Sequence, residues 1–297
     1  MTAPFPSLAG RTCVVTGATS GIGRATAWEL AKLGARTFVV GRDAARARRT
    51  RNEIARATGN DEIEFVVADL SSTASVRGLA TELLARAPRL DILVNNAATL
   101  PRSRQTTVDG LEMQLAVNHL ASYALTRLLL PRLIATAPAR IINVASQVES
   151  WGRIDFGDLQ RERGYDHLDA YAQSKLANVL FTYELARRLE GTRVTANCLH
   201  PGVIATKLLA DFNGRPRALG FALRFTHPGP EAGARTSVRL AADPMLAGVT
   251  GRYFRDGREA QSSPASYDVA LARRLWDVSA QLVGLPTEPA GVESAAR

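Results

Sequence analysis

Short runs of apolar residues alternate along the chain with longer segments in which apolar positions recur with a helical period. The short runs predict seven buried strands, at Thr12–Thr16, Thr37–Val40, Ile63–Val67, Ile92–Asn95, Arg140–Val144, Val194–Cys198 and near Gly251–Phe254. The longer segments predict six helices, at about Ile22–Leu33, Ala44–Thr58, Val76–Ala87, Leu111–Ala135, Tyr171–Leu189 and Pro230–Ala241. This alternation predicts one doubly wound α/β domain over residues 1–285, with a seven-stranded, mainly parallel sheet and helices on both faces.

Two stretches interrupt the alternation and are long for connections within a compact domain. Trp151–Asp169 is rich in charged residues and Gly, and Lys207–His227 carries three Phe among Gly and Pro. Such insertions are usually lids or binding loops, so we expect a substrate loop at about 207–227, although the Phe residues are equally compatible with ordinary packing. The Pro- and Glu-containing segment 286–297 is expected to be a disordered tail.

Composition narrows the class of protein. With 297 residues, 46% of them hydrophobic, the chain can bury a full core. The formal net charge is +9, but the arginines are scattered apart from a modest cluster at Arg42–Arg51, so we expect no nucleic-acid partner. The two Cys and four His are not clustered, so no metal site is expected. The chain shows neither a signal-peptide pattern nor a membrane-spanning apolar run, which favours a soluble, cytoplasmic protein.

A glycine-rich segment, Thr16–Gly23, follows the first predicted strand and opens the first predicted helix. In a Rossmann-type domain, helix N–H groups and the helix dipole hold the phosphates of a dinucleotide at this place. Gly17 would allow the tight turn, Gly21 the approach of the pyrophosphate, and Gly23 the close packing of helix on strand. A turn that merely caps a helix is the alternative, but the position after an apolar strand favours a cofactor loop.

Tyr171 and Lys175 form a candidate catalytic pair. They are four residues apart at the start of a predicted helix, so their side chains share one face. A phenol with a pKa of about 10 is a poor base at neutral pH, and a neighbouring ammonium would stabilise the phenolate. Tyr171 could then exchange a proton with a substrate oxygen. An exposed helix pair without a catalytic role is the alternative.

Two further polar residues occupy positions that favour a role in the same site. Ser146 follows the fifth predicted strand, at the sheet edge where open α/β folds bind ligands, and its hydroxyl could hold a substrate carbonyl. A strand-end Ser is also a common turn or cap residue. Asn118 lies in the middle of a predicted helix, although Asn is a poor helix former.

Together these motifs resemble the short-chain dehydrogenase/reductase family. The Gly-x3-Gly-x-Gly spacing of the loop resembles the family's cofactor loop, and the run from Asn95 to Ala98 resembles its Asn-Asn-Ala-Gly signature, with Ala98 in place of Gly. The resemblance implies a catalytic tetrad of Asn118, Ser146, Tyr171 and Lys175. In that tetrad the Asn holds a water that relays protons from the lysine, and the lysine also binds ribose hydroxyls.

The resemblance also implies the remaining cofactor contacts. Asp69-Leu70 resembles the pair that contacts adenine, although a helix N-cap role through Ser71 explains Asp69 equally well. Pro201–Thr206 resembles the segment that contacts the nicotinamide carboxamide; for His200, just before it, we favour a structural role. The implied cofactor site consists of Gly17, Thr19, Ser20, Gly21, Ile22, Gly23, Arg42, Asp69, Leu70, Asn96, Ala97, Tyr171, Lys175, Pro201, Gly202, Val203 and Thr206.

The end of the second predicted strand favours NADP over NAD. A carboxylate at this place would accept hydrogen bonds from the ribose of NAD, whereas an arginine would pair with the extra phosphate of NADP. Gly41 occupies the position of the carboxylate, and Arg42 follows directly. The alternatives are that Arg42 is an ordinary surface residue or that Asp43 faces the ribose.

The expected reaction is hydride transfer between the nicotinamide and a carbonyl or carbinol carbon, with Tyr171 as acid or base. The 25-residue separation of Ser146 and Tyr171 resembles the retinol-dehydrogenase-like branch, which implies a lipophilic aldehyde, ketone or alcohol. Epimerisation, dehydration or a catalytically silent cofactor-sensing role are the alternatives. The resemblance also implies a homodimer or homotetramer through the two long predicted helices, unless their apolar faces are covered within one chain.

Overall fold

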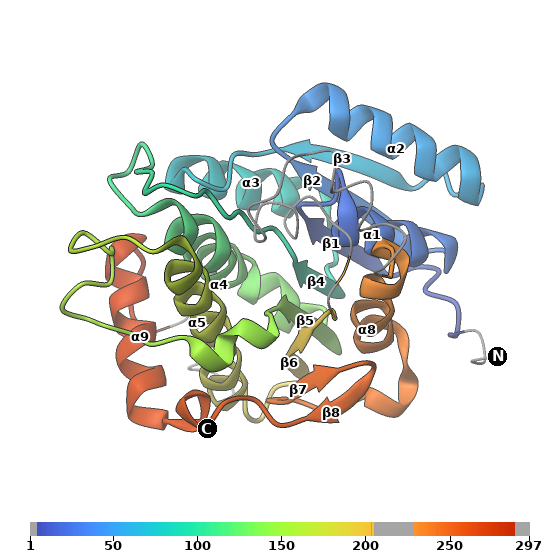
Figure 1. The fold of residues 1–297 in the computed structure, drawn as a ribbon. Coiled ribbons are helices and arrows are strands. Elements are labelled where there is room, and N and C mark those ends of the chain that lie inside the picture. The colour runs from blue at the N-terminus through green and yellow to red at the C-terminus, as the bar shows by residue number, and fades with distance from the viewer. Residues whose placement is uncertain (1–4, 203, 205–227, 289–297) are drawn as a thin grey trace.

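The computed structural model describes residues 5–202, 204 and 228–288 (Figure 1). Within these residues one sheet contains eight strands in the order β3-β2-β1-β4-β5-β6-β7-β8. The strands are β1 (Thr12–Thr16), β2 (Arg36–Gly41), β3 (Ile63–Val67), β4 (Ile92–Asn95), β5 (Ala139–Val144), β6 (Val194–His200), β7 (Tyr253–Arg255) and β8 (Arg258–Ala260). The described helices are α1 (Gly21–Lys32), α2 (Ala44–Thr58), α3 (Thr73–Arg86), α4 (Ala121–Ala135), α5 (His167–Arg188), α8 (Pro230–Ala242) and α9 (Val269–Leu282).

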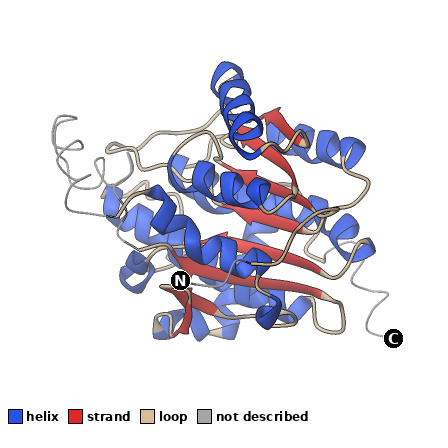
Figure 2. Ribbon diagram, turned by 90° about the vertical axis from the view of Figure 1, so that its right-hand side faces the viewer, coloured by secondary structure: helices blue, strands red, loops and turns tan. Residues whose placement is uncertain are grey.

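Helices cover both faces of the sheet because alternate strand residues point to opposite sides (Figure 2). On one face, Val14 belongs to a core that includes side chains of α3, α4 and α5. On the other, Cys13 and Val15 belong to a core that includes side chains of α1, α2 and α8. The predicted doubly wound α/β fold is confirmed.

The sheet has one strand more than the predicted seven. β8 pairs antiparallel with β7, so the edge departs from the parallel pairing of the other strands. The turn between them contains Asp256 and Gly257 with φ of 51° and 75°, a left-handed conformation that suits a tight hairpin. β8 has only three residues, and Arg258 and Glu259 are exposed, so it carries too little apolar pattern for detection from sequence.

The helix predicted over Leu111–Ala135 starts later and is not uniform. Leu115–Leu120 forms a π-helical turn, η1, that leads into α4. Glu112 lies before this turn and accepts hydrogen bonds from the amides of Gln114 and Leu115 (2.9 and 2.7 Å). A π-helical segment inside a helix is often found at a functional site, and this one contains Asn118.

The insertion Trp151–Asp169 is pinned to neighbouring elements. Gln173 of α5 donates to the carbonyl of Leu159 (2.9 Å), and Arg104 donates to the carbonyl of Gln160 (3.1 Å). The side chain of Gln160 accepts from the amide of Glu112 (2.7 Å). The predicted loop at 207–227 lies outside the described residues.

Helix α9 is not among the six helices predicted from the sequence, and it covers α5 within the same chain. Trp276 of α9 packs against Tyr123 of α4 and Phe181 of α5, with ring centroids 5.0 and 5.9 Å apart. Of the expected tail, Pro286 and Glu288 accept from Arg127 through their carbonyls (2.7 and 2.9 Å), whereas 289–297 lie outside the described residues. Among the helices described, none is both long and apolar enough to cross a bilayer.

Candidate active site

The carboxyl ends of β1, β4, β5 and β6 lie side by side and bring the predicted motifs together. In the parallel register, Asn95 of β4 pairs with Asn143 of β5, and Val144 of β5 pairs with Leu199 of β6. The strand order reverses between β1 and β4, and ligands of open α/β sheets bind at such a switch point.

The glycine loop is shaped by close contact with the segment after β4. Gly17 has a φ of 64°, and a Cβ there would lie 2.9 Å from the Cα of Ala97. A Cβ on Gly23 would collide with the Asn96 side chain and lie 2.5 Å from the carbonyl oxygen of Gly17. Both positions therefore require glycine for the loop to lie this close to the segment after β4.

Asn96 and Ala97 fix this loop through Thr16. The Asn96 carboxamide donates to the carbonyl of Thr16 (2.8 Å), and the amides of Asn96 and Ala97 donate to the Thr16 hydroxyl (3.0 and 3.1 Å). The segment therefore supports the phosphate loop. Ala98 does not have a positive φ, so replacing the usual glycine introduces no strain.

The N-terminus of α1 fits an anionic group. Its N-cap, Ser20, makes no side-chain hydrogen bond to the first turn, whereas Asp43, Ser72 and Asp166 cap α2, α3 and α5 through their side chains. N–H groups of this turn are thus available to a phosphate. A hollow of about 610 Å3 adjoins this end and is lined by Thr19, Ser20, Gly21, Arg24, Arg46, Arg49, Thr50, Glu53, Gly229, Pro230 and Glu231.

A Cβ on Gly41, at the end of β2, would collide with the Thr19 methyl group. A carboxylate at 41 would therefore need Thr19 to move. Asp43 accepts from the amide of Arg46 (2.9 Å) as the N-cap of α2, which favours a structural role over contact with ribose. Arg42 is exposed beside them.

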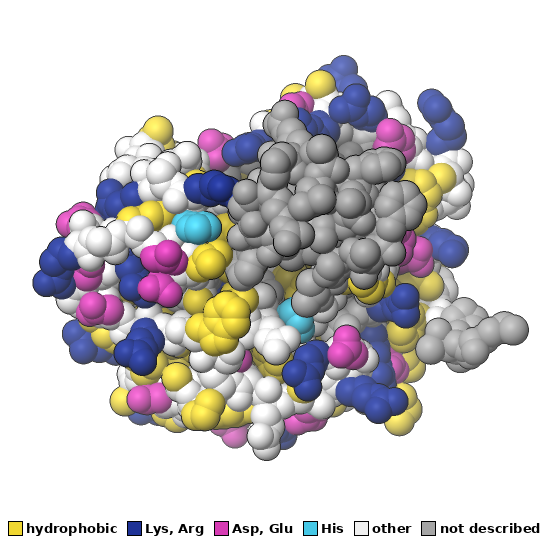
Figure 3. Space-filling model, viewed as in Figure 1, with side chains coloured by type: hydrophobic (Ala, Val, Ile, Leu, Met, Phe, Trp, Pro, Cys, Tyr) yellow, Lys and Arg dark blue, Asp and Glu magenta, His cyan; other side chains and the backbone are white. Residues whose placement is uncertain are grey.

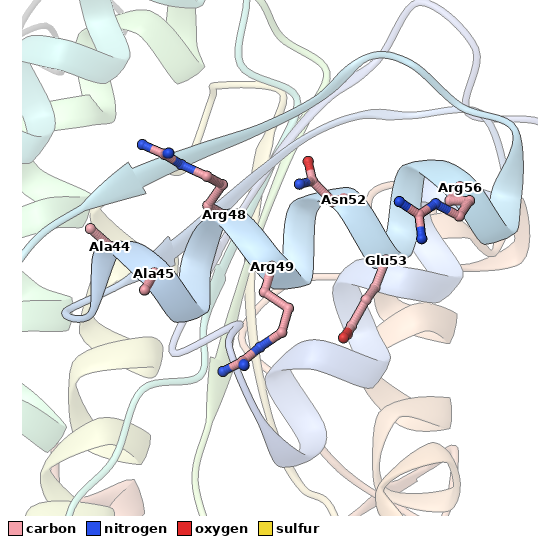
Figure 4. A pocket seen from close by; sticks show the side chains of 7 residues that line it. All are labelled: Ala44, Ala45, Arg48, Arg49, Asn52, Glu53 and Arg56. Atoms are coloured by element: carbon pink, nitrogen blue, oxygen red, sulfur yellow. The ribbon is translucent and has the colours of Figure 1, made fainter.

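Basic side chains gather at the upper right edge of the face in Figure 3, where α2 lies. Arg49 and Glu53 lie on the side of α2 that faces α1 (Figure 4), where Glu53 pairs with Arg24 (2.7 Å). A hollow of about 620 Å3 along α2 is lined by Ala44, Ala45, Arg48, Arg49, Asn52, Glu53 and Arg56. It contains none of the predicted catalytic side chains, so we place the chemistry at the sheet edge.

Asp69 and Leu70 lie after β3. One Asp69 carboxylate oxygen accepts from the amide and hydroxyl of Ser71 (3.0 and 2.8 Å), so the expected turn with Ser71 is present. The N-cap of α3, however, is Ser72. Leu70 packs against the core on the α3 side.

Tyr171 and Lys175 lie on the first turns of α5, and both are buried. The Lys175 ammonium donates to the carbonyl of Val144 at the end of β5 (3.0 Å) and lies 5.4 Å from the Tyr171 ring centroid. Burial raises the pKa of Tyr171, and a hydrogen bond with Ser146 opposes that shift. Burial lowers the pKa of Lys175 to about 8. Three members of the predicted tetrad are therefore brought together.

Asn118 is fully buried and held in place by its neighbours. Its carboxamide accepts from the amide of Thr99 (2.7 Å) and donates to Thr99 O and to the Ser174 hydroxyl (3.1 and 3.0 Å). The backbone carbonyl of Asn118 accepts from the side-chain amide of Asn178 (2.9 Å). Ser174 and Asn178 are residues that sequence reasoning missed. Both lie within the motif around Lys175, but nothing in their spacing indicates partners 56 and 60 residues away. The relay of protons through Asn118 stays a prediction.

His200 ends β6 and accepts from the amide of Gln147 through Nδ1 (3.1 Å). The structural role expected for His200 agrees with this contact. Pro201 and Gly202 follow at the sheet edge, whereas Val203 and Thr206 lie outside the described residues. Gly202 has a φ of 89°, which the turn after β6 requires.

Comparisons with known proteins agree with this geometry. A family model described as short chain dehydrogenase matches residues 11–216. The chain belongs to the short-chain dehydrogenase family. It is 44% identical to retinol dehydrogenase 14 of Mus musculus, over 93% of this chain and 86% of that protein. It is 42% identical to retinol dehydrogenase 11 of Homo sapiens, over 95% and 88%.

Two solved structures have the same fold as this chain. An uncharacterized protein from Mycobacterium paratuberculosis matches with a TM-score of 0.78 and 34% identity, over 96% of this chain and 98% of that one. The RhlG/NADP active-site complex of Pseudomonas aeruginosa matches with a TM-score of 0.69 and 32% identity, over 86% and 98%. The protein is therefore a retinol-dehydrogenase-like oxidoreductase of a family that uses nicotinamide cofactors.

Proposed function

We propose that this short-chain dehydrogenase is an NADP-dependent enzyme that interconverts a lipophilic aldehyde or ketone and its alcohol. The observation that carries the proposal is the buried Lys175 ammonium, which lies 5.4 Å from the Tyr171 ring centroid and donates to Val144 O. Burial raises the pKa of the Tyr171 phenol, and Ser146 lies close enough to oppose that rise. A lysine with less than 2% of its side chain exposed is expensive to keep charged, which favours a chemical use over a structural one.

The bound nicotinamide would supply or accept the hydride, and the protein would manage the oxygen of the substrate. In reduction, Ser146 orients the carbonyl oxygen and Tyr171 donates its proton to it. The Lys175 ammonium, oriented by Val144 O, stabilises the phenolate that remains. In oxidation the same groups act in reverse. Asn118 joins the π-helical turn η1 to α5 through its hydrogen bonds with Ser174 and Asn178.

The preference for NADP is supported by charge at the end of β2. Position 41 carries no carboxylate, and the carboxylate of Asp43 caps α2. Arg42 is exposed directly after β2, and Arg46 and Arg49 line the hollow beside the N-terminus of α1. A guanidinium can hold a phosphate through two parallel hydrogen bonds. Some solved relatives were obtained as NADP complexes.

The lipophilic substrate is supported by the names of the relatives, which are retinol dehydrogenases. Within the part of the chain that the structure describes, Ser146 and Tyr171 would bind a single substrate oxygen, which is compatible with an aldehyde, a ketone or a simple alcohol.

Fluorescence titration with NADPH and NADH tests the cofactor assignment. The wild type is expected to bind NADPH more tightly, and Arg42→Ala to weaken NADPH binding by about 1.5–3 kcal/mol while leaving NADH unchanged. Arg56→Ala is the matched control, since it removes the same charge near the far end of α2. Equal losses in both variants, or tighter binding of NADH by the wild type, would refute the assignment.

A further inference from the structure

Two groups outside the proposed mechanism hold the turn that carries Ser146. Ser146 is the N-cap of a short 3-10 helix, η2 (Gln147–Trp151). The amide of Gln147 donates to Nδ1 of His200 (3.1 Å). Two residues further, the Glu149 carboxylate accepts from the amide and hydroxyl of Ser263 (2.9 and 2.6 Å). The turn is therefore anchored on β6 at one end and on the C-terminal segment at the other.

The contact of His200 defines the state of its ring. A nitrogen that accepts from a backbone N–H carries no proton, so the imidazole is neutral with its hydrogen on Nε2. His200 is 5% exposed, and burial lowers its pKa to about 4. The acceptor is thus present throughout the neutral pH range.

The contact of Glu149 continues into a chain of hydrogen bonds among buried and half-buried groups. Ser263 O accepts from Ser266 (2.6 Å), whose hydroxyl also bonds Ser262 (2.6 Å), and Ser262 bonds the phenol of Tyr183 on α5 (2.7 Å). Glu149 is 3% exposed, and a buried carboxylate is stable only when its oxygens are hydrogen-bonded. Movement of η2 would leave the Glu149 carboxylate without its bonds from Ser263, so displacing η2 is energetically costly.

Both anchors act on the backbone that directs the Ser146 hydroxyl. The carbonyl of Ser146 accepts from the amide of Glu149 (3.1 Å), and its Oγ lies 3.5 Å from the amide nitrogen of Val148. The direction of the hydroxyl therefore depends on the placement of η2, while the phosphate loop and α2 make no part of these contacts.

We propose that His200 and Glu149 are positioning residues that direct the Ser146 hydroxyl toward the substrate oxygen. The inference rests on the proposed role of Ser146. A reacting group displaced by about 1 Å can lose about a hundredfold in rate, so loss of one anchor lowers turnover without removing a catalytic group. In the proposed function the phosphate loop and the end of β2 hold the phosphates of the cofactor, and neither takes part in these contacts. NADPH binding is therefore expected to stay close to that of the wild type, although Pro201 and Gly202 follow His200 directly.

A matched pair of variants separates the hydrogen bond from the space that the ring fills. His200→Asn keeps an oxygen close to the place of Nδ1, whereas His200→Leu has nearly the same shape and no acceptor. We expect His200→Leu to lower kcat/KM for a medium-chain aldehyde by about ten- to a hundredfold. His200→Asn recovers most of the activity, and both variants keep the wild-type Kd for NADPH.

A double-mutant cycle with Ser146→Ala shows whether the effect passes through Ser146. In the Ser146→Ala background, His200→Leu is expected to change kcat/KM by less than about twofold. Equal losses in both backgrounds, or no recovery with His200→Asn, would overturn the inference alone. Full activity of Ser146→Ala would overturn the proposed role of Ser146 and the inference with it.

Ser263→Ala gives a second test that leaves the turn itself intact. It removes one of the two donors to Glu149 and is expected to lower kcat/KM about three- to tenfold, again only when Ser146 is present. This variant decides the question if His200→Leu does not fold. A loss that persists in Ser146→Ala would assign Glu149 a merely structural role.

Discussion

Burial moves the two central ionisable groups in opposite directions. It raises the pKa of the Tyr171 phenol and lowers that of the Lys175 ammonium to about 8, because each loses the hydration of its charged form. At neutral pH the pair is therefore a neutral phenol beside a cation. This state is ready to donate a proton to a carbonyl, and a phenolate formed next to the ammonium is stabilised.

The pKa of Lys175 predicts the pH dependence of the reductive reaction. The ammonium is present below about pH 8 and is lost as the pH rises through that value. We expect kcat/KM for aldehyde reduction to be level below pH 8 and to fall above it, measured at saturating NADPH. Lys175→Met should show low activity without this limb, while the exposed Lys32→Met keeps the wild-type profile. An alkaline limb retained in Lys175→Met would argue against the assignment.

The residues of the candidate active site could be located from the sequence because each follows a recognisable strand or motif; their catalytic roles stay a prediction. The Tyr171-to-Lys175 spacing and the strand-end position of Ser146 are local features. The partners that hold Asn118 and Ser146 could not be predicted, since Asn178 and His200 reach them only through the fold. Hydrogen bonds over 53 and 60 residues leave no periodic signal in the chain.

Among the elements, the long buried strands and most helices agree with their hydrophobic pattern, and the missed elements have particular reasons. β8 is too short to show alternation. The signal for α9 is present, because Asp268 caps a segment with buried residues at Ala272, Leu275, Trp276 and Ser279. The π-turn around Asn118 has no signature of its own, and it resulted in a wrong start for the helix predicted at Leu111.

His119 of this π-turn contacts both α5 and α9, and its burial leads us to expect that acid destabilises the fold. Its ring bonds Asn178 Oδ1 through Nδ1 (3.3 Å) and the Ser279 hydroxyl through Nε2 (2.9 Å), and burial lowers its pKa from 6.5 to about 4. The unfolded chain thus binds the proton more readily, so the free energy of unfolding falls as pH drops from about 6.5 to 4. The contribution is on the order of 3 kcal/mol.

Denaturant unfolding across that pH range measures the effect. His119→Gln is expected to reduce the slope of unfolding free energy against pH. The slope that remains includes contributions from His200, whose pKa is also about 4, and from carboxyl groups with shifted pKa values such as Asp91 and Glu149. Substitution of an exposed, uncharged residue provides a control, because it leaves the slope of unfolding free energy against pH unaltered. An unchanged slope in His119→Gln would show that His119 is not the group that titrates.

At the scale of the whole molecule, α9 occupies the outer side of α5. Trp276 packs against α4 and α5, the two helices through which the family resemblance implies a dimer. The guanidinium of Arg188 lies 4.5 Å from the ring centroid of Trp276. We expect no dimer through α4 and α5 and a mass in solution of 31.9 kDa, measured by light scattering during gel filtration. A dimer whose cross-links join two copies of α4 or α5 would contradict this arrangement.

The most direct test of the proposed chemistry is turnover of NADPH with a lipophilic aldehyde by the wild type and by Tyr171→Phe. The substitution removes one hydroxyl and keeps the ring beside Lys175. We expect the wild type to oxidise NADPH as the alcohol forms, and Tyr171→Phe still to bind NADPH but, at saturating NADPH, to turn over about 100- to 10,000-fold more slowly. Similar turnover rates in both proteins would contradict the proposed transfer of a proton by Tyr171.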